Sequence, residues 1–266
     1  MLDFNHRPTP AERISEAIDA ALEARHAQQQ PRDYLGASRI GADCNRALQY
    51  EYLHTPVDTG RSFSGKQLRV FEAGHTFEAM AAGWLRLAGF DLFTEKADGQ
   101  QFGFAAAGGR IRGHVDGIIN GAPAELGLTF PMLWECKALN NKSWKDTQKR
   151  GLVLSKPVYA AQIAIYQAYM DGAVLGIASN PALFTAINKD TAELYIELLP
   201  FDAALAQKMS DRAVNILQAC DVHELLPRIA NDSAHHVCKM CGRARCALSI
   251  KLAGNAGGQD RCWGQP

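Results

Sequence analysis

Two strand-like segments of this sequence, residues 114–119 and 133–137, are separated by a polar interval rich in glycine and proline. Successive side chains of a β-strand point to opposite faces of a sheet. Glu135 and Lys137 therefore share one face, and Cys136 between them faces the other way, into a predicted core. We expect the two segments to pair, either as a hairpin or as neighbouring strands of one sheet.

Pairing of these strands would bring Asp116 of the first segment close to Glu135 and Lys137. Two carboxylates that lie close together repel each other unless a cation lies between them. Oxygen ligands of this kind suit Mg²⁺ or Mn²⁺, and a neighbouring lysine can position a water molecule or stabilise charge that develops on a phosphate. The pattern predicts metal-dependent phosphodiester hydrolysis. The alternative interpretation is a strand pair that carries a surface ion pair.

The bulk properties exclude little, but they limit how the chain can bind nucleic acid. A chain of 266 residues, 47% of them hydrophobic and 21% charged, can form one large or two small globular domains. The 28 basic and 28 acidic residues cancel, so any contact with DNA must depend on local basic patches. We find no signal-peptide core and no apolar run of about 20 residues, and we expect a cytoplasmic protein without membrane contact.

The order of the predicted elements is helices, short strands, a helix, a hairpin, a last helix and a tail. This order predicts an α/β fold with a central mixed β-sheet flanked by helices, an N-terminal helical part and a cysteine-rich C-terminal tail. Residues 110–119 are expected to form one continuous strand, residues 132–138 another, and residues 139–150 a loop and a short helix. The chain has no glycine-rich dinucleotide or Walker-type loop.

Two of the predicted helices carry further candidates for a site. In the helix expected over residues 67–87, His75 and Glu78 lie on one face, and Gly74 costs about 1 kcal/mol relative to alanine. In the helix expected over residues 158–171, tyrosines three and four residues apart form a stripe with Gln162 in its middle. A core or surface histidine and a packing stripe are the alternative interpretations, although a glutamine is unusual in a core.

The cysteines predict a metal centre. Seven cysteines in a cytosolic chain favour metal or cluster ligation over disulfides. Cys238 and Cys241 have a chelating spacing, Cys246 and Cys262 follow them, and Cys44 is available far upstream. Zinc could be bound by cysteines of the tail alone, with a histidine of the tail as a substitute, whereas an iron–sulfur cluster could recruit Cys44 as its fourth ligand.

Together these pieces resemble the RecB-like branch of the PD-(D/E)XK nucleases, and look most like its iron–sulfur members, such as the CRISPR-adaptation exonucleases and the AddB nuclease domain. The motifs occur in the family's order over most of the chain. They are Cys44, Gly74-His75-x₂-Glu78, Gly113-His114-Val115-Asp116-Gly117, Glu135-Cys136-Lys137, Gln162-x₃-Tyr166, and Cys238-x₂-Cys241 with Cys246.

The resemblance implies a Mg²⁺- or Mn²⁺-dependent DNA nuclease. It implies an exonuclease that acts on DNA ends or single strands in recombination, repair, or phage or CRISPR DNA processing, together with partner proteins of those pathways. His75, Asp116 and Glu135 would bind the divalent metal together with the carbonyl group of Cys136, and Lys137 would be the catalytic lysine near the attacking water. His114 lies on the same strand face as Asp116 and competes with His75 for the role of ligand.

The same resemblance assigns Gln162 and Tyr166, which would orient the site and contact the DNA strand. The basic segment that includes Lys149 and Arg150 could follow the DNA phosphates, and the alternative is a solvated surface. The ligands of a 4Fe–4S cluster, with zinc as the alternative, would be Cys44, Cys238, Cys241 and Cys246.

The family has a slightly longer gap before its last cysteine, so Cys262 could replace Cys246. Residues 1–232 are expected to form the nuclease domain and residues 233–266 a tail that closes the metal cluster with Cys44. The other functions that fit the sequence are a catalytically inactive nuclease-fold protein that binds DNA ends and a zinc-stabilised structural protein.

Overall fold

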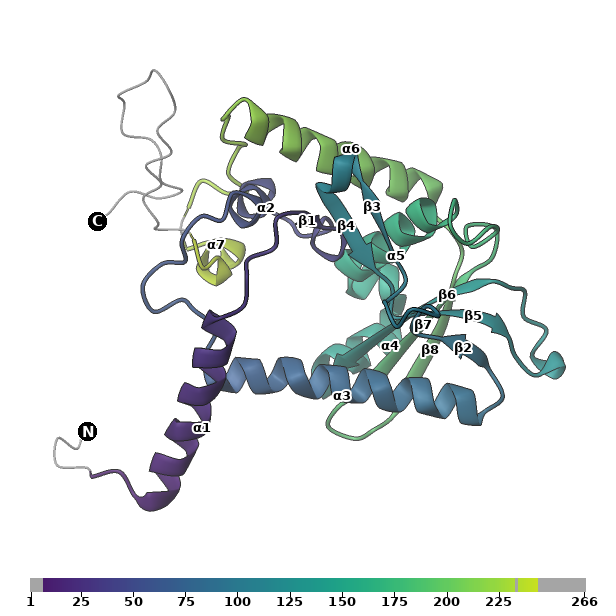
Figure 1. Cartoon of the computed structure of the whole chain (residues 1–266), viewed down its shortest axis with the longest axis horizontal. Helices are drawn as coiled ribbons and strands as arrows, with labels where there is room; N and C mark the ends of the chain where they lie inside the picture. Colours follow the sequence, from purple (N-terminus) through teal and green to yellow (C-terminus); the bar gives the residue numbers. More distant parts are fainter. Residues whose placement is uncertain (1–6, 233, 244–266) are drawn as a thin grey trace.

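The computed structural model describes residues 7–232 and 234–243, which form helices around two β-sheets (Figure 1). The helices are α1 (Pro10–Ala27), α2 (Asn45–Tyr52), α3 (Gly65–Leu87), α4 (Asn141–Ser155), α5 (Pro157–Met170), α6 (Ala203–Asp221) and α7 (His236–Met240). The strands are β1 (Leu35–Gly36), β2 (Asp91–Phe93), β3 (Gly103–Ala106), β4 (Ile111–His114), β5 (Gly117–Gly121), β6 (Met132–Leu139), β7 (Ala182–Asn188) and β8 (Leu194–Leu199).

The larger sheet has five strands in the order β2-β5-β6-β7-β8. Its central pair, β6 and β7, is parallel, and the other neighbours are antiparallel. The smaller sheet has the order β1-β4-β3. The predicted α/β fold with a central mixed sheet flanked by helices is therefore confirmed.

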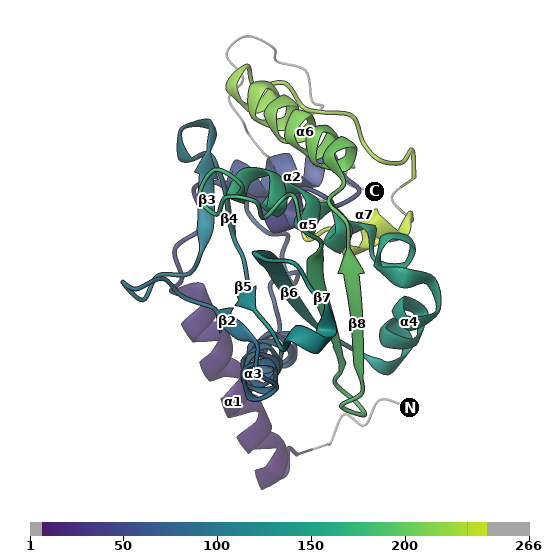
Figure 2. The ribbon, with the colours of Figure 1, turned by 90° about the vertical axis from the view of Figure 1, so that its right-hand side faces the viewer.

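Strand β6 separates two hydrophobic cores because its side chains alternate between the faces of the sheet. Trp134 and Cys136 are buried with Ala81 and Ala82 of α3 on one face. Leu133 belongs to the core on the other face, which includes residues of α5 and α6. Figure 1 shows α3 below the sheet and α5 and α6 above it, and Figure 2 gives the same layers from the side.

Two predicted elements differ from the structure. The strand expected over residues 110–119 is two strands in different sheets, because the chain leaves β4 at His114 and enters β5 at Gly117. Residues 139–150, expected as a loop and a short helix, belong largely to α4, which continues to Ser155. This helix is kinked at Gly151, whose φ of 74° is accessible to glycine at little cost.

The chain after α6 is attached to the chain around α2. Gln49 of α2 is buried, its side-chain amide donates a hydrogen bond to the carbonyl group of Glu224 (2.5 Å), and its carbonyl oxygen accepts one from the N–H group of Leu226 (3.1 Å). Farther along, the N–H group of Asp58 donates to the carbonyl group of Gly242 (2.7 Å), and Arg243 donates to the carbonyl group of Thr55 (2.7 Å). The C-terminal part of the described chain thus lies beside α2 (Figure 1).

We expect Gln49→Leu to lower the free energy of unfolding by about 2–4 kcal/mol. The substitution leaves the buried N–H group of Leu226 and the partly buried carbonyl group of Glu224 without these partners, and a buried unpaired group costs about 1–3 kcal/mol. Gln207→Leu is the matched control, because Gln207 lies on the exposed surface of α6, where we expect a change within about 0.5 kcal/mol. Urea unfolding measures both, and equal effects would contradict this account of the attachment.

In the part of the chain that the structure describes, no helix combines the length and the apolar character that a membrane span requires.

Candidate active site

The structure brings Asp116, Glu135 and Lys137 together at the point where β5 and β6 meet. Strand β5 pairs with β6 so that Gly117 lies opposite Trp134, which places Asp116 at the next position along the sheet. The N–H group of Cys136 donates a hydrogen bond to Asp116 Oδ2 (2.8 Å), and Lys137 Nζ lies 3.8 Å from the same oxygen. Lys137 Nζ also donates to Glu135 Oε1. The predicted convergence of two carboxylates and one ammonium group is present in the structure.

Glu135 is the most deeply buried member of the cluster, with a fully inaccessible side chain. Its Oε1 atom accepts a hydrogen bond from Lys137 and a second from the side-chain amide of Gln162 on α5 (2.5 Å). Its Oε2 atom is buried and has no hydrogen-bond partner among the described residues. A buried polar atom without a partner costs free energy, so this oxygen is suited to a cation that the protein itself does not supply.

The pKa values in the cluster reflect an excess of acidic groups over basic groups. Burial and the nearby Asp116 carboxylate raise the pKa of Glu135 to about 8, although Lys137 opposes the shift. Burial alone would lower the pKa of Lys137, but Glu135 and Asp116 raise it above its ordinary value, so this side chain remains an ammonium group. The ring of Tyr159 on α5 lies against this ammonium group, 5.5 Å from Nζ to the ring centroid.

Helix α3 contributes Glu78 to this cluster. Burial and the Asp116 carboxylate raise the pKa of Glu78, and Glu78 in turn contributes to the raised pKa of Glu135. His75, the predicted metal ligand, lies one turn earlier with its side chain 82% exposed, and its Nδ1 atom is 3.8 Å from Glu78 Oε2. Glu78 is therefore the carboxylate of α3 that reaches the cluster, whereas His75 is linked to the cluster through its contact with Glu78.

Helix α5 covers the same side of the sheet with the predicted glutamine and tyrosines. Gln162 holds Glu135 Oε1, as described above, and Tyr166 is buried beside it. Burial and the Glu135 carboxylate raise the pKa of Tyr166, and its ring packs edge-on against Phe104 of β3. Part of the polar-aromatic stripe is thus a packing face, and Gln162 is the member that contacts the carboxylates.

The structure places three other predicted site residues on α4 and at the end of β4. Lys149 and Arg150 are exposed on α4, where Arg150 pairs with Asp146 (3.3 Å) and donates to the carbonyl group of Leu154 (2.8 Å). His114 ends β4 with an exposed side chain. In the described residues, neither hydrogen bonds nor ion pairs link these three side chains to Asp116, Glu135 or Lys137.

The cysteines from the two ends of the chain come near each other. Cys44 is buried at the residue that precedes α2, and Cys238 is buried in α7. Burial raises the pKa of Cys241, and the proximity of Cys44 raises it further. Cys246 and Cys262 lie outside the described residues, so the structure contains three of the four predicted ligands.

The described residues contain no group of three histidine, cysteine, aspartate or glutamate side chains already arranged to hold a metal ion. The donors nevertheless fit a divalent cation, because Glu135 Oε2 is buried without a partner and carboxylates from α3, β6 and the β4–β5 junction surround one ammonium group. Asp116, Glu135 and Glu78 are the residues that would hold the ion, and the carbonyl group of Cys136 and His75 remain predicted ligands.

The similarities of this chain to known proteins are to solved structures. The sequence matches no protein-family model, and no curated protein matches it significantly. Among solved structures, the chain is similar to an alkaline exonuclease (LHK-Exo) from Laribacter hongkongensis, with 16% identity over 78% of this chain and 93% of that chain and a TM-score of 0.48. The complex of that exonuclease with dAMP gives 14% identity over the same shares and a TM-score of 0.47.

A structure titled SSO0001 has 15% identity over 82% of this chain and 98% of that chain, with a TM-score of 0.46. Similarity of this degree carries no argument about function. The function is therefore argued from the carboxylate cluster, and the RecB-like and iron–sulfur assignments stay predictions.

Proposed function

We propose that this protein is a divalent-metal-dependent DNA nuclease that hydrolyses phosphodiester bonds. The observation that carries the proposal is the buried Glu135 carboxylate. One of its oxygens is held by Lys137 and Gln162, and the other has no hydrogen-bond partner among the described residues. Buried side-chain polar atoms are in the large majority of cases paired. A site that takes up Mg²⁺ or Mn²⁺ accounts for the unpaired oxygen.

Each residue of the cluster has a distinct task in this proposal. A bound divalent metal would lower the pKa of the attacking water and neutralise charge on the phosphate. Asp116 and Glu135 supply the anionic oxygens, and Glu78 adds a third carboxylate from α3. The Lys137 ammonium group places a fixed positive charge beside the position where the phosphate gains negative charge. Gln162 holds Glu135 in one orientation.

A digestion assay tests this function. We expect labelled linear DNA to be degraded with Mg²⁺ or Mn²⁺ and to remain intact with EDTA. We expect Asp116→Asn to be inactive. Degradation of linear DNA with closed circular DNA left intact would support the exonuclease mode, and cleavage of the circle would replace it by an endonuclease mode. If neither DNA nor RNA is hydrolysed with either metal, the proposed function is wrong.

We expect Gln162→Leu to weaken metal binding or activity by about 10–100-fold. The substitution removes one of the two donors that orient the Glu135 carboxylate, and partners of metal ligands contribute effects of this size. Gln148→Leu, on the exposed side of α4, is the control and should match the unmodified protein. Titration with Mn²⁺ followed by the melting temperature, together with the digestion assay, measures both effects.

We further propose that Cys44, Cys238, Cys241 and Cys246 bind a 4Fe–4S cluster with a structural role. The approach of Cys44 and Cys241, and the backbone hydrogen bond between Asp58 and Gly242, support this part of the proposal. Protein purified without oxygen should be brown and contain about four iron atoms per chain, as a cluster of this type requires. Zinc in place of iron would assign a zinc site, and absence of both metals would refute the centre.

A non-enzymatic DNA-end-binding protein is the second candidate. It would bind DNA ends through the same surface without hydrolysis, so the digestion assay combined with a binding assay separates the two functions.

A further inference from the structure

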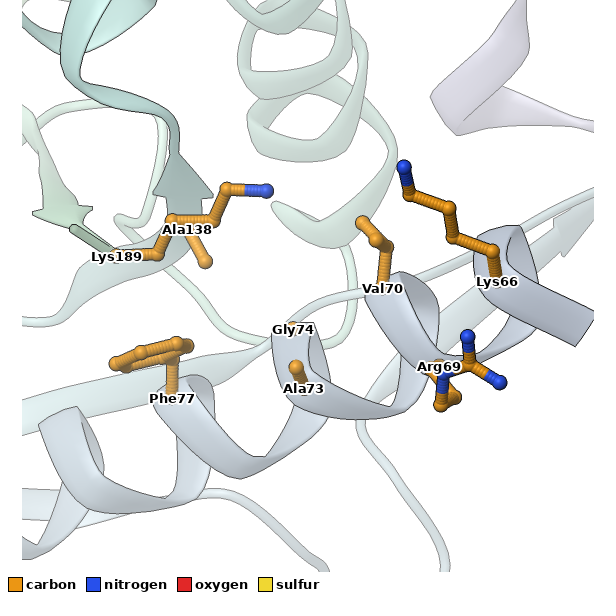
Figure 3. A pocket seen from close by; sticks show the side chains of 8 residues that line it. All are labelled: Lys66, Arg69, Val70, Ala73, Gly74, Phe77, Ala138 and Lys189. Atoms are coloured by element: carbon orange, nitrogen blue, oxygen red, sulfur yellow. The ribbon is translucent and has the colours of Figure 1, made fainter. Parts of the chain in front are cut away.

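A pocket of about 300 Å³ lies between α3 and the ends of β6 and β7 (Figure 3). We call it the α3 pocket. Its lining residues are Lys66, Arg69, Val70, Ala73, Gly74, Phe77, Ala138 and Lys189. The volume is at the lower end of the range of about 300–1,000 Å³ that is usual for small-molecule sites.

The charges that line the α3 pocket are all positive. Arg69 pairs with Asp19 of α1, whereas no acidic side chain of the described residues forms an ion pair with Lys66 or Lys189. Figure 3 shows these two lysines directed into the space beside Gly74 from opposite sides. Two ammonium groups that face one cavity without a counter-charge are suited to an anion such as a phosphate group.

The α3 pocket adjoins the carboxylate cluster through α3. Gly74 precedes Glu78 by four residues, which is about 6 Å along a helix axis. On β6, Ala138 directly follows Lys137, but its side chain lies on the α3 face of the strand, opposite the face of Lys137. The Gly74 end of the pocket therefore lies within about two nucleotide rises of 3.4 Å from Glu78, and Phe77 gives the pocket an aromatic wall.

We propose that the α3 pocket binds one nucleotide of the DNA strand next to the scissile phosphate. The flanking phosphate lies between Lys66 and Lys189, and the sugar or base rests against Phe77, because aromatic rings accept any base. This inference rests on the proposed nuclease function and names how the substrate strand is held beside the reaction centre.

Gly74 offers a direct way to close the pocket. A Cβ atom added at Gly74 would meet no atom within 4 Å, and the backbone there is helical, so a side chain can begin there without backbone strain. We expect the side chain of a leucine at this position to extend into the α3 pocket. Gly83 of the same helix is the matched control, since a Cβ atom there also meets nothing within 4 Å but Gly83 does not line the pocket. Both substitutions replace a helical glycine, so we expect both to raise the melting temperature by about 2–4 °C.

The experiment measures hydrolysis of a short labelled single-stranded DNA with Mn²⁺ over a series of salt concentrations. We expect Gly74→Leu and the double variant Lys66→Gln, Lys189→Gln to raise KM about tenfold or more, and Gly83→Leu to leave it unchanged. We expect the double variant to reduce the slope of log affinity against log salt by about 0.7, the value for one lost phosphate contact on a single strand.

The outcomes separate this inference from the proposed function. If the unmodified protein hydrolyses DNA while both pocket variants keep its KM and salt slope, the nucleotide subsite is refuted and the function stands. If the unmodified protein hydrolyses no nucleic acid, both fail. Gly74→Leu and the Gly83→Leu control are also compared in melting temperature and in stabilisation by Mn²⁺. Equal values for the two variants show that Gly74→Leu acts through the pocket and not through the fold or the metal ligands.

Discussion

Lys137→Met should lower the rate of DNA hydrolysis by about 10²–10³-fold, the usual effect of removing one preorganised group that stabilises transition-state charge. The Lys137 ammonium group is held by Glu135 Oε1 and lies 3.8 Å from Asp116 Oδ2. It stays charged because these two carboxylates raise its pKa. Methionine keeps most of the volume of the side chain but removes the charge and the hydrogen bond to Glu135. Steady-state hydrolysis of labelled DNA at saturating Mn²⁺ measures the effect.

Removal of Lys137 also affects stability, so folding must be checked separately. Loss of one partner of a buried ion pair costs about 3–5 kcal/mol, and we expect that loss in the metal-free variant, with partial recovery when Mn²⁺ binds. Lys142→Met is the matched control, because Lys142 is exposed in the first turn of α4. A folded Lys137→Met protein with the activity of the control would remove this lysine from the reaction.

Glu135→Gln should abolish the stabilisation by metal while leaving the metal-free protein as stable as before, or more stable. Glutamine resembles the protonated carboxyl group that the metal-free protein keeps below a pKa of about 8, and it retains an acceptor for Lys137 and Gln162. It cannot become the anionic ligand that a cation requires. For an unmodified protein at 100 times the dissociation constant of the metal, binding contributes about 2.7 kcal/mol. Thermal unfolding with EDTA and with Mn²⁺ measures both parts of the prediction.

The same carboxylate gives the metal-free protein a defined pH dependence. The folded state keeps the Glu135 proton up to a pKa of about 8, whereas the unfolded chain loses it near the ordinary value for glutamate. The folded state therefore binds more protons in this window, and stability falls as pH rises towards 8. Glu135→Gln should remove that slope, and Glu125→Gln at an exposed position should retain it. An unchanged slope in Glu135→Gln would show that Glu135 does not carry the proton.

Local periodicity was sufficient to predict the faces of β6. Alternation in a strand places Glu135 and Lys137 on one face and Cys136 on the other, and the structure confirms this arrangement because β6 lies between two cores that leave no other orientation. The pairing of Asp116 with this strand was also predictable, since Gly117 and the apolar residues after it can only be buried beside β6.

Other features depend on tertiary contacts that the sequence does not reveal. The many polar residues of α4 led to the prediction of a loop and a short helix. The segment is a longer helix whose buried side, including Trp144, packs on the core. The apolar Val115 continues the strand pattern through the break between the two sheets. His75 and Glu78 share a helix face, and only the position of α3 against the sheet decides that Glu78 reaches the carboxylates while His75 faces solvent.

The hydrogen bond from the Cys136 N–H group to Asp116 has a practical consequence for spectroscopy. At this position the ladder between β5 and β6 ends, and a side-chain carboxylate replaces the carbonyl group of a neighbouring strand as acceptor. The N–H group of Cys136 is thus hydrogen-bonded to the Asp116 carboxylate, whose electrostatic environment changes when a cation binds to the cluster. Its amide resonance should act as an internal sensor that reports occupancy of the cluster in solution, before any bond of a substrate is broken.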